Sequence, residues 1–356
     1  MRLRTAFGVV RLKVWRGRNP ADGRWGTPIR QRWGLSPHQQ LSPALEDKLA
    51  YFATVAGTYE SAAQLARKMS IPIEDSTVRE LVQRLGGRAE MQTQQRLRTV
   101  PQPCDPQSPP SALAVIMIDG YQVRHRGADW GKKKARKARV EWHEQKVGVF
   151  YHQDQNADGE LLKKVSLGWQ GEAVELGQRL HWEASRQGLG RARQTLAVGD
   201  GAPWIWHLIE QRWKGAHQVL DFYHASQHLH TLGEALHPAD EPARQRWVNQ
   251  QCHDLRHGKE KQLLKRIDRL PAGSGPKAEA IRREKNYFRS HSHRMNYQTL
   301  SRRGWPIGSG SVESACAQRQ RRFKRPGQFW TAEGLRRLNA LIEARELHHW
   351  DQLWAN

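Results

Sequence analysis

Short apolar runs, each closed by an acid and a glycine, stand out in the middle of the chain. The run 113–118 is rich in β-branched residues and leads into Asp119, which predicts a buried strand with a carboxylate at its end. The run 195–199 repeats the arrangement with Asp200, and a proline then opens a predicted helix over 204–214. We therefore expect two carboxylates at two strand ends.

Further strands and helices alternate around these runs. Strand patterns cover 144–152 and 216–221, and a helical pattern covers 172–187. This alternation predicts an α/β fold. From 225 to 303 the pattern is helical and polar throughout, which predicts an all-α insertion that interrupts the α/β layer.

The N-terminal part follows other patterns. Residues 5–15 alternate as a strand does, which predicts a small β element. The segment 76–85 has a serine cap, an apolar stripe and a terminal glycine, and 69–75 joins it to a preceding helix. Such a pair resembles a helix-turn-helix, with a plain helical bundle as the alternative.

Five prolines and several glutamines between 94 and 110 are typical of an extended linker, so a domain boundary is expected there. The predicted domains are a small β or irregular segment (1–40), a helix-turn-helix-like DNA-binding region (41–93), the linker (94–110), the first part of a catalytic core (111–224), the helical insertion (225–303) and the second part of the core (304–356).

The charge balance points to a polyanionic partner. Lys and Arg number 58 against 35 Asp and Glu, a formal net charge of +23. Neutralising phosphates with such side chains releases condensed counterions and drives nucleic-acid binding. A basic ribosome-like or RNA-packing protein has the same composition and remains the alternative.

Cysteine usage and hydropathy narrow the setting. Cys104, Cys252 and Cys316 are far apart and form no close pair, so the sequence predicts neither a disulfide framework nor a cysteine zinc site. No run approaches the ~18 apolar residues of a membrane span, and Met1 is not followed by a signal-peptide pattern. We expect a soluble cytoplasmic protein, associated with the nucleoid and not with membranes.

A third acid completes a metal-site pattern. Glu313 follows the serine- and glycine-rich segment 308–311 and falls in the first turn of a predicted helix over 311–325. Gathered with Asp119 and Asp200, its carboxylate would suffer repulsion that cations relieve. Two Mg²⁺ ions, with Mn²⁺ as substitute, suit such oxygen ligands and support phosphoryl transfer on nucleic acid. Taken singly, each acid is more typical of an ordinary turn or helix start than of a metal site.

Two basic stretches lie beside these acids in the sequence, the run 131–137 and the helix 311–325. A solvated basic face is the alternative interpretation for the helix. The predicted DNA-contacting residues are Thr77, Arg79, Arg84, Lys132, Lys133, Lys134, Arg319, Arg322, Lys324 and Arg325.

Asp221 and His224 close the third predicted strand, where a hydrogen-bonding role at the edge of the site fits them. Zinc ligation by His224 and His228 is the alternative, although no third ligand is evident. Most of the 15 tryptophans are interpreted as core or interdomain residues, with stacking on an unpaired base as the alternative role. The tryptophans considered for stacking are Trp204, Trp206, Trp247 and Trp305.

Taken together, four motifs resemble the DDE transposases of bacterial insertion sequences, in particular the Kra-type group, which is related to the Mutator-like superfamily. The motifs are Ile118-Asp119-Gly120, the segment 199–206 (Gly-Asp-Gly-Ala-Pro-Trp-Ile-Trp), Asp221-Phe222-Tyr223-His224, and the segment 308–314 leading into 321–327.

This resemblance implies an RNase H-like core, a mixed sheet with flanking helices, interrupted by the helical insertion. It implies Asp119, Asp200 and Glu313 as the catalytic, metal-binding triad, with Asp221 and His224 as an accessory motif. The expected function is binding of terminal inverted repeats and metal-dependent cleavage and transfer of double-stranded DNA, element ends and target alike, by at least a dimer. A non-catalytic DNA-binding regulator or decayed transposase, and an RNase H-like structure-specific nuclease, remain alternatives.

Two departures from the family pattern are visible. Related proteins often begin with a cysteine-bearing ribbon, whereas residues 1–40 contain no cysteine, so a zinc-dependent N-terminal module is not expected. Many DDE enzymes also carry a basic residue two turns after the catalytic glutamate, where this chain has Gln320. Lys324 or Arg319 is the candidate substitute.

Overall fold

A computed structural model describes residues 1–20, 22–35, 39–107, 110–134, 137–155, 161–271 and 273–355. The chain forms two compact units. The first unit comprises Met1–Arg98, Val123–Trp142 and Arg319–Asn356, and the second comprises Thr99–Gln122 and His143–Gln318.

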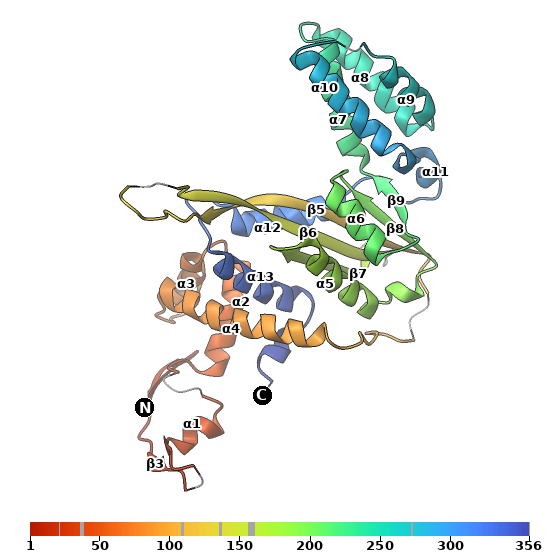
Figure 1. The fold of residues 1–356 in the computed structure, drawn as a ribbon. Helices are drawn as coiled ribbons and strands as arrows, with labels where there is room; N and C mark the ends of the chain where they lie inside the picture. Colours follow the sequence, from red (N-terminus) through yellow and green to blue (C-terminus); the bar gives the residue numbers. More distant parts are fainter. Residues whose placement is uncertain are drawn as a thin grey trace. The chain divides into compact units, whose positions relative to one another are not determined.

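A five-stranded sheet with the order β7-β6-β5-β8-β9 is the centre of the second unit (Figure 1). β5 is parallel to β8, and β8 is parallel to β9, whereas β6 and β7 are antiparallel. The predicted α/β class is therefore confirmed as a mixed sheet with helices. The strands are β5 (Leu113–Arg126), β6 (Val140–Gln155), β7 (Leu161–Trp169), β8 (Gln194–Gly199) and β9 (His217–Leu220).

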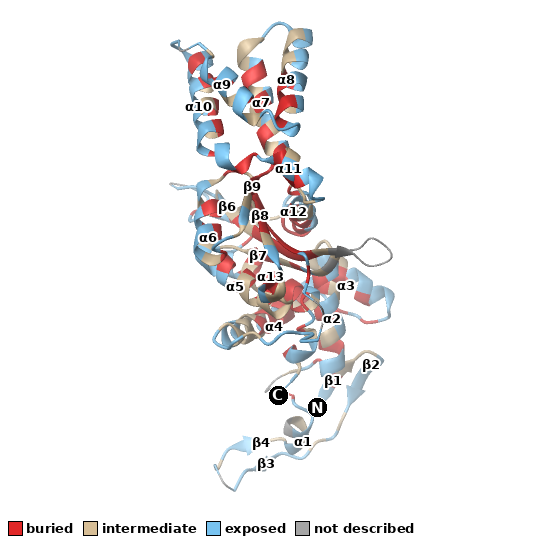
Figure 2. Cartoon of the chain, turned by 90° about the vertical axis from the view of Figure 1, so that its right-hand side faces the viewer, coloured by how far each residue is buried: buried red, intermediate tan, exposed pale blue. Residues whose placement is uncertain are grey.

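The apolar run that begins β5 forms the core of this sheet. Every residue from 113 to 118 is at most 1% exposed, and Figure 2 shows the middle of the sheet in the buried colour. Consecutive buried residues mean that both faces of the strand are covered, which is typical of parallel pairing. The helices α5 (Ala173–Arg186) and α6 (Pro203–Arg212) pack against each other, α5 also against β7 and α6 against β8.

The predicted helical insertion is present between β9 and the Glu313 helix. Its first helix begins at Phe222, three residues before the predicted start, because the side chain of Asp221 caps it. α7 packs against α8 and α10, and α9 packs against the same two helices. The helices are α7 (Phe222–Leu236), α8 (Glu241–Arg256), α9 (Glu260–Asp268), α10 (Pro276–Ser290) and α11 (Tyr297–Arg302), followed by α12 (Gly310–Phe323).

In the first unit, a group of helices follows two small hairpins. α13 packs against α2 and α4, and α3 packs against both α2 and α4. The hairpin strands are β1 (Arg2–Thr5) with β2 (Gly8–Arg11) and β3 (Gly17–Arg18) with β4 (Trp25–Gly26). The helices are α1 (Pro28–Arg32), α2 (Pro43–Val55), α3 (Tyr59–Lys68), α4 (Asp75–Arg96) and α13 (Ala332–Glu346).

Three local predictions differ from these elements. The strand expected over 5–15 is a hairpin that turns after Thr5, since Gly8 adopts a φ of 120°. The helix expected over 76–85 continues to Arg96, so the first residues of the predicted 94–110 linker are helical. Residues 108 and 109 of that linker lie outside the described residues.

The glycine taken as the end of that helix has another role. A Cβ on Gly86 would lie 2.3 Å from the carbonyl oxygen of Arg337, so a side chain there would prevent the close contact of α4 with α13. The glycine thus serves helix packing inside α4 and does not end the helix.

The strand that carries Asp119 also continues further than predicted. β5 runs to Arg126, so Asp119 lies within a strand and not at its end. The physical reason is that only the parallel pairing with β8 stops at Ile118, while β6 continues as the neighbour on the other side. Among the described helices, none combines the length and apolar character that a membrane crossing requires.

Candidate active site across three parallel strands

Three aspartates form one row across the parallel part of the sheet. Ile118 of β5 is in register with Gly199 of β8, and Gly199 is in register with Leu220 of β9. An aspartate follows each of these three residues in the sequence, namely Asp119, Asp200 and Asp221. Because neighbouring strands lie about 4.8 Å apart, the row brings three carboxylates to one edge of the sheet.

Glu313 joins this row through Ser309. The predicted helix begins at Gly310, and Glu313 lies in its first turn, as expected. The hydroxyl of Ser309 donates to Glu313 Oε1 at 2.6 Å, and the backbone N–H of Ser309 donates to Asp221 Oδ2. Ser309 is buried, so this pair of hydrogen bonds fixes the start of α12 against the end of β9.

Cys316 provides a second contact from α12 to the row. Its thiol lies 3.5 Å from Asp119 Oδ2, and its side chain is buried. The other oxygen of Asp119 accepts the backbone N–H of Gly120 at 2.6 Å. α12 therefore contacts the aspartate after β9 through Ser309 and the aspartate in β5 through Cys316.

Asp221 and His224 form a close pair. Asp221 is fully buried, its Oδ1 accepts the backbone N–H of His224 at 2.8 Å, and its carboxylate lies 3.5 Å from His224 Nδ1. Burial alone would raise the pKa of Asp221, but the hydrogen bonds from His224 and Ser309 lower it overall. Hydrogen bonding to Asp221 raises the pKa of His224, against the effect of burial.

The electrostatics of Asp119 differ from those of Asp221. Burial raises the pKa of Asp119, the charge of Asp200 raises it further, and the Gly120 N–H, Cys316 and His224 only partly offset this. Two negative charges are thus held near each other in a partly desolvated place. Such a pair favours a cation nearby.

The potential metal ligands are grouped differently from the predicted triad. The ligand atoms of Asp221, His224 and Glu313 all lie within 4.8 Å of one another, the one trio gathered so closely in the described part of the chain. Asp119 and Asp200 lie at the same sheet edge, and both act electrostatically on His224. The structure thus brings the five predicted residues, four acids and one histidine, to one place, with Glu313 close to the Asp221–His224 pair that the family resemblance treats as accessory.

The helical insertion also contributes to this site. Tyr287 of α10 donates its hydroxyl to the backbone carbonyl of Asp200 at 2.9 Å, and its ring stacks on His228 at 3.5 Å between centroids. A Cβ on Gly201 would lie 2.8 Å from the Tyr287 ring, and its φ of 105° already favours glycine. His228 forms a hydrogen bond with Glu284. This hydrogen bond engages the His228 nitrogen Nδ1 and is an alternative to the zinc ligation considered for His228.

A cavity of about 830 Å³ adjoins the Asp200 turn, between α6 and α10. Trp204 and Trp206 both line it, but Trp206 is only 4% exposed and lies under the guanidinium of Arg294 at 4.2 Å. Of these two tryptophans, Trp204 is the more accessible platform for stacking.

Sequence reasoning did not find Ser309, Cys316 or Tyr287 as site residues. Ser309 was visible as a possible helix cap but its contacts with Asp221 and Glu313 had no signal in the sequence. Cys316 sits one turn after Glu313, and that spacing was the only available hint of a shared helix face. Tyr287 is 87 positions from Asp200, and nothing in the sequence relates them.

The predicted DNA-contacting residues fall into two groups. Arg79 is exposed and Thr77 is half-buried on α4, while the exposed Arg84 pairs with the buried Glu46. Lys132 pairs with Asp129 at 2.6 Å. The exposed members are Arg79, Arg84, Lys132, Lys133, Lys134, Lys324 and Arg325.

Arg319 and Arg322 are buried instead. Arg319 donates to Asn339 Oδ1 at 2.7 Å, and Arg322 lies over the rings of Tyr59 and Trp330 at 5.1 and 5.4 Å. Both are interior packing residues in this conformation, so direct DNA contact by their guanidinium groups does not fit their positions. Exposed and buried arginines alternate along this stretch, which a run of charges in the sequence does not reveal.

Comparison with known proteins adds little to this geometry. No protein-family model matches the chain, and no curated protein matches its sequence significantly. Among solved structures, the chain is similar to the Drosophila P element transposase strand transfer complex, with 10% sequence identity, a TM-score of 0.27, and coverage of 86% of this chain and 79% of that chain. A TM-score this low does not assign a fold, so the function must be inferred from the site itself.

Proposed function

We propose that the protein is a DNA transposase that binds terminal inverted repeats and catalyses metal-dependent DNA strand cleavage and strand transfer on an RNase H-like core. The observation that carries the proposal is the registered row of Asp119, Asp200 and Asp221 across three parallel strands, with Glu313 bound to its end through Ser309. A chain with a net charge of +23 supplies the matching affinity for double-stranded DNA.

The donor set fits divalent metal ions. Carboxylate oxygens are the ligands that Mg²⁺ prefers, with Mn²⁺ as a substitute. Burial and the charge of Asp200 together raise the pKa of Asp119, and a bound cation would relieve both effects. Asp119, Asp200 and Glu313 would hold two such ions, which when bound lower the pKa of an attacking hydroxyl and neutralise charge on the phosphate.

The remaining residues have positioning roles in this proposal. Asp221 accepts the backbone N–H groups of both His224 and Ser309, and the Ser309 hydroxyl holds the Glu313 carboxylate. Tyr287 holds the backbone of Asp200. The exposed basic residues of the chain would bind the DNA backbone, and cleavage and joining at two element ends requires at least a dimer.

Strand cleavage and joining by the purified protein would test this function. Labelled duplexes that tile the DNA on both sides of the gene are incubated with Mg²⁺ or Mn²⁺, and the products are separated by length. Wild type should expose a 3′ end and join it to a second duplex. Asp119→Asn and Glu313→Gln should lose both steps but keep DNA affinity, since exposed cations supply most of that affinity.

Asp351→Asn is a suitable control because this acid is exposed and belongs to the other unit. Cleavage without joining would indicate the nuclease alternative. Binding without cleavage by wild type on every duplex would indicate the regulator or a decayed enzyme. Full activity of Asp119→Asn would refute the assignment of the row.

A further inference from the structure

Positive charge is concentrated at the N-terminal end of the chain. Residues 1–35 contain nine Lys and Arg and a single acid, Asp22, so about a tenth of the chain carries eight of its 23 net positive charges. Asp22 accepts the backbone N–H of Arg24 at 3.0 Å, within its own turn. This segment therefore has almost no internal neutralisation.

Several of these cations are not paired with an acid in the part of the chain that the structure describes. Among the described residues, no ion pair involves Arg2, Arg11, Lys13 or Arg16, and Arg11, Lys13 and Arg16 are exposed. Closely spaced cations repel one another and lower the stability of the segment that carries them. A cluster of cations that is not neutralised by acids favours the binding of an anionic ligand, which would relieve this repulsion.

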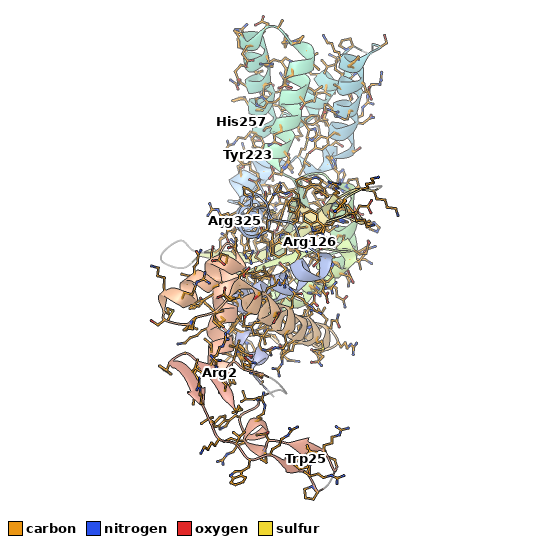
Figure 3. The ribbon with its side chains drawn as sticks, turned by 90° about the vertical axis from the view of Figure 1, so that its left-hand side faces the viewer. Arg2, Trp25, Arg126, Tyr223, His257 and Arg325 are labelled. Carbon is orange, nitrogen blue, oxygen red and sulfur yellow. The ribbon has the colours of Figure 1, made fainter. Side chains whose placement is uncertain are left out.

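The same segment exposes large aromatic rings. Phe7 is 99% exposed, Trp15 is 92% exposed and Trp25 is 66% exposed. Figure 3 shows Trp25 with its side chain at the outer end of the small β3–β4 hairpin. Single exposed apolar residues are common on protein surfaces. Three exposed aromatic rings within a stretch of about twenty residues indicate instead a surface that is covered when a ligand binds.

Rings and cations alternate along these hairpins. Phe7 occupies the tip of the β1–β2 hairpin, where its N–H donates to Thr5 Oγ1 at 3.2 Å. Trp25 is the cross-strand partner of Arg18, and Trp15 precedes Arg16 in the sequence. Residues that face each other across two strands have Cβ atoms about 5 Å apart, so a ring and a guanidinium can meet adjacent parts of one ligand.

We propose that residues 1–35 bind an unpaired strand of nucleic acid, with the cations on its phosphates and Phe7, Trp15 and Trp25 stacked on its bases. Charge alone would suit a duplex equally well. The aromatic rings favour a single strand over a duplex, because paired bases are stacked on one another and present no free face to a side chain. An anionic membrane surface also attracts exposed Trp with Arg, and the test below includes it.

This inference goes beyond the proposed transposase activity and does not depend on the chemistry at the strand ends. The test uses the full chain in EDTA, so the absence of catalysis does not affect it. Affinities are measured for a fluorescent 20-nucleotide oligothymidylate, for a duplex of the same length, and for phosphatidylserine vesicles. Wild type, Trp15→Ala/Trp25→Ala and the control Trp142→Ala are compared.

Stacking on an aromatic side chain is worth about 1 to 3 kcal/mol per base, so the double variant should lose at least about tenfold in affinity for oligothymidylate. Its affinity for the duplex should change by less than about twofold. Trp142 is 55% exposed but already contacts Arg124 and Lys324, so Trp142→Ala should bind oligothymidylate as wild type does.

A second variant separates charge from stacking. Arg11→Gln/Lys13→Gln/Arg16→Gln should weaken binding to both nucleic acids and should reduce the slope of log K against log salt by roughly 2 to 3 units. Equal loss for single strand and duplex in the double Trp variant, no loss for either, or an effect confined to the vesicles would each overturn the proposal. Because both rings are exposed, thermal unfolding of the double variant should match wild type.

Discussion

Tyr287 donates its hydroxyl to the main-chain carbonyl of Asp200, a hydrogen bond of 2.9 Å that joins residues 87 positions apart. Tyr287 belongs to α10 of the helical insertion, and its ring stacks on His228 of α7. His228 in turn hydrogen-bonds Glu284, which is buried. The insertion therefore supports the turn that positions a candidate catalytic carboxylate.

Replacing Tyr287 with Phe should remove this support and little else. The free energy of unfolding should fall by about 1 kcal/mol, the net value of an ordinary hydrogen bond. Cleavage should fall several-fold because the Asp200 turn is less well held. The control is Tyr297→Phe, since the Tyr297 hydroxyl is buried with no hydrogen-bond partner among the described residues and its removal should not destabilise. Equal effects in both variants would contradict this role.

Ser309→Ala should lower cleavage by about tenfold with little effect on DNA affinity. The substitution removes the hydroxyl bonded to Glu313 but keeps the backbone N–H that donates to Asp221, so the helix start is retained while the carboxylate is freed. Ser314→Ala is the matched control, because Ser314 is exposed on the same helix. Cleavage rates at saturating DNA measure the difference, and an unchanged rate in Ser309→Ala would remove Ser309 from the site.

Asp254 should stabilise the helical insertion in a pH-dependent way. Its buried carboxylate accepts hydrogen bonds from Gln250, Lys259 and Arg266 at 3.1, 3.2 and 2.7 Å. Burial would raise the pKa of Asp254, but these hydrogen bonds and the charge of Lys259 lower it overall. The folded pKa lies below the unfolded value, so the stabilisation is present above pH about 4 and is lost as pH falls through the folded pKa.

At pH 7, Asp254→Asn should therefore lower the free energy of unfolding by about 1 to 2 kcal/mol, with Lys259 and Arg266 partly exposed and screened. Urea unfolding at pH 7, 5 and 3 should show the difference from wild type shrinking at the lowest pH. Glu279→Gln, at an exposed acid of α10, should show no such trend. A gap that stays constant down to pH 3 would argue against an ionised Asp254 as its cause.

The neighbouring arginines 321 and 322 should behave in opposite ways. Burial lowers the pKa of Arg322 to about 10, and the side chain packs between Tyr59 and Trp330 while donating to the carbonyl of Gly57 at 3.1 Å. Arg322→Gln should lower the free energy of unfolding by about 1 to 3 kcal/mol. Arg321 is exposed, so Arg321→Gln should leave stability unchanged.

The two variants should also differ in DNA binding. If Arg321 contacts a phosphate, its loss should reduce the salt slope by about one unit, whereas Arg322→Gln should bind normally at temperatures where it is folded. Thermal unfolding together with affinity at two salt concentrations distinguishes the two. A pure affinity loss in Arg322→Gln, without destabilisation, would restore Arg322 as a DNA-contacting residue.

The sequence predicted the carboxylates of the site better than the contacts that hold them. Asp200 follows a short apolar run and precedes a proline-initiated helix, and both signals are local, so β8 and α6 were found near their true bounds. Glu313 was equally visible from its serine-rich helix start. Periodicity and capping depend on neighbouring residues and can be recognised in one chain.

The errors arose where packing decides between local alternatives. Gly120 after Asp119 suggested a turn, yet β5 continues because β6 remains beside it, and the glycine lies close to Glu144. Gly86 suggested a helix end, yet α4 continues because α13 packs against that position. A glycine signals reduced bulk, and only the tertiary structure shows whether a turn or a neighbour requires it.

The position of Asp119 inside β5 has a kinetic consequence. The residues before Asp119 belong to the buried part of β5 that pairs with β8 and has β6 as its other neighbour, whereas Asp200 lies just outside β8 in a turn. Backbone amides of a central strand exchange with solvent deuterium only through openings that approach global unfolding, while those of a turn exchange through local fraying. The two carboxylates therefore sit on backbone of different exchange lifetimes: Asp119 follows strand amides that exchange only on global opening, whereas the Asp200 backbone depends on its hydrogen bond from Tyr287.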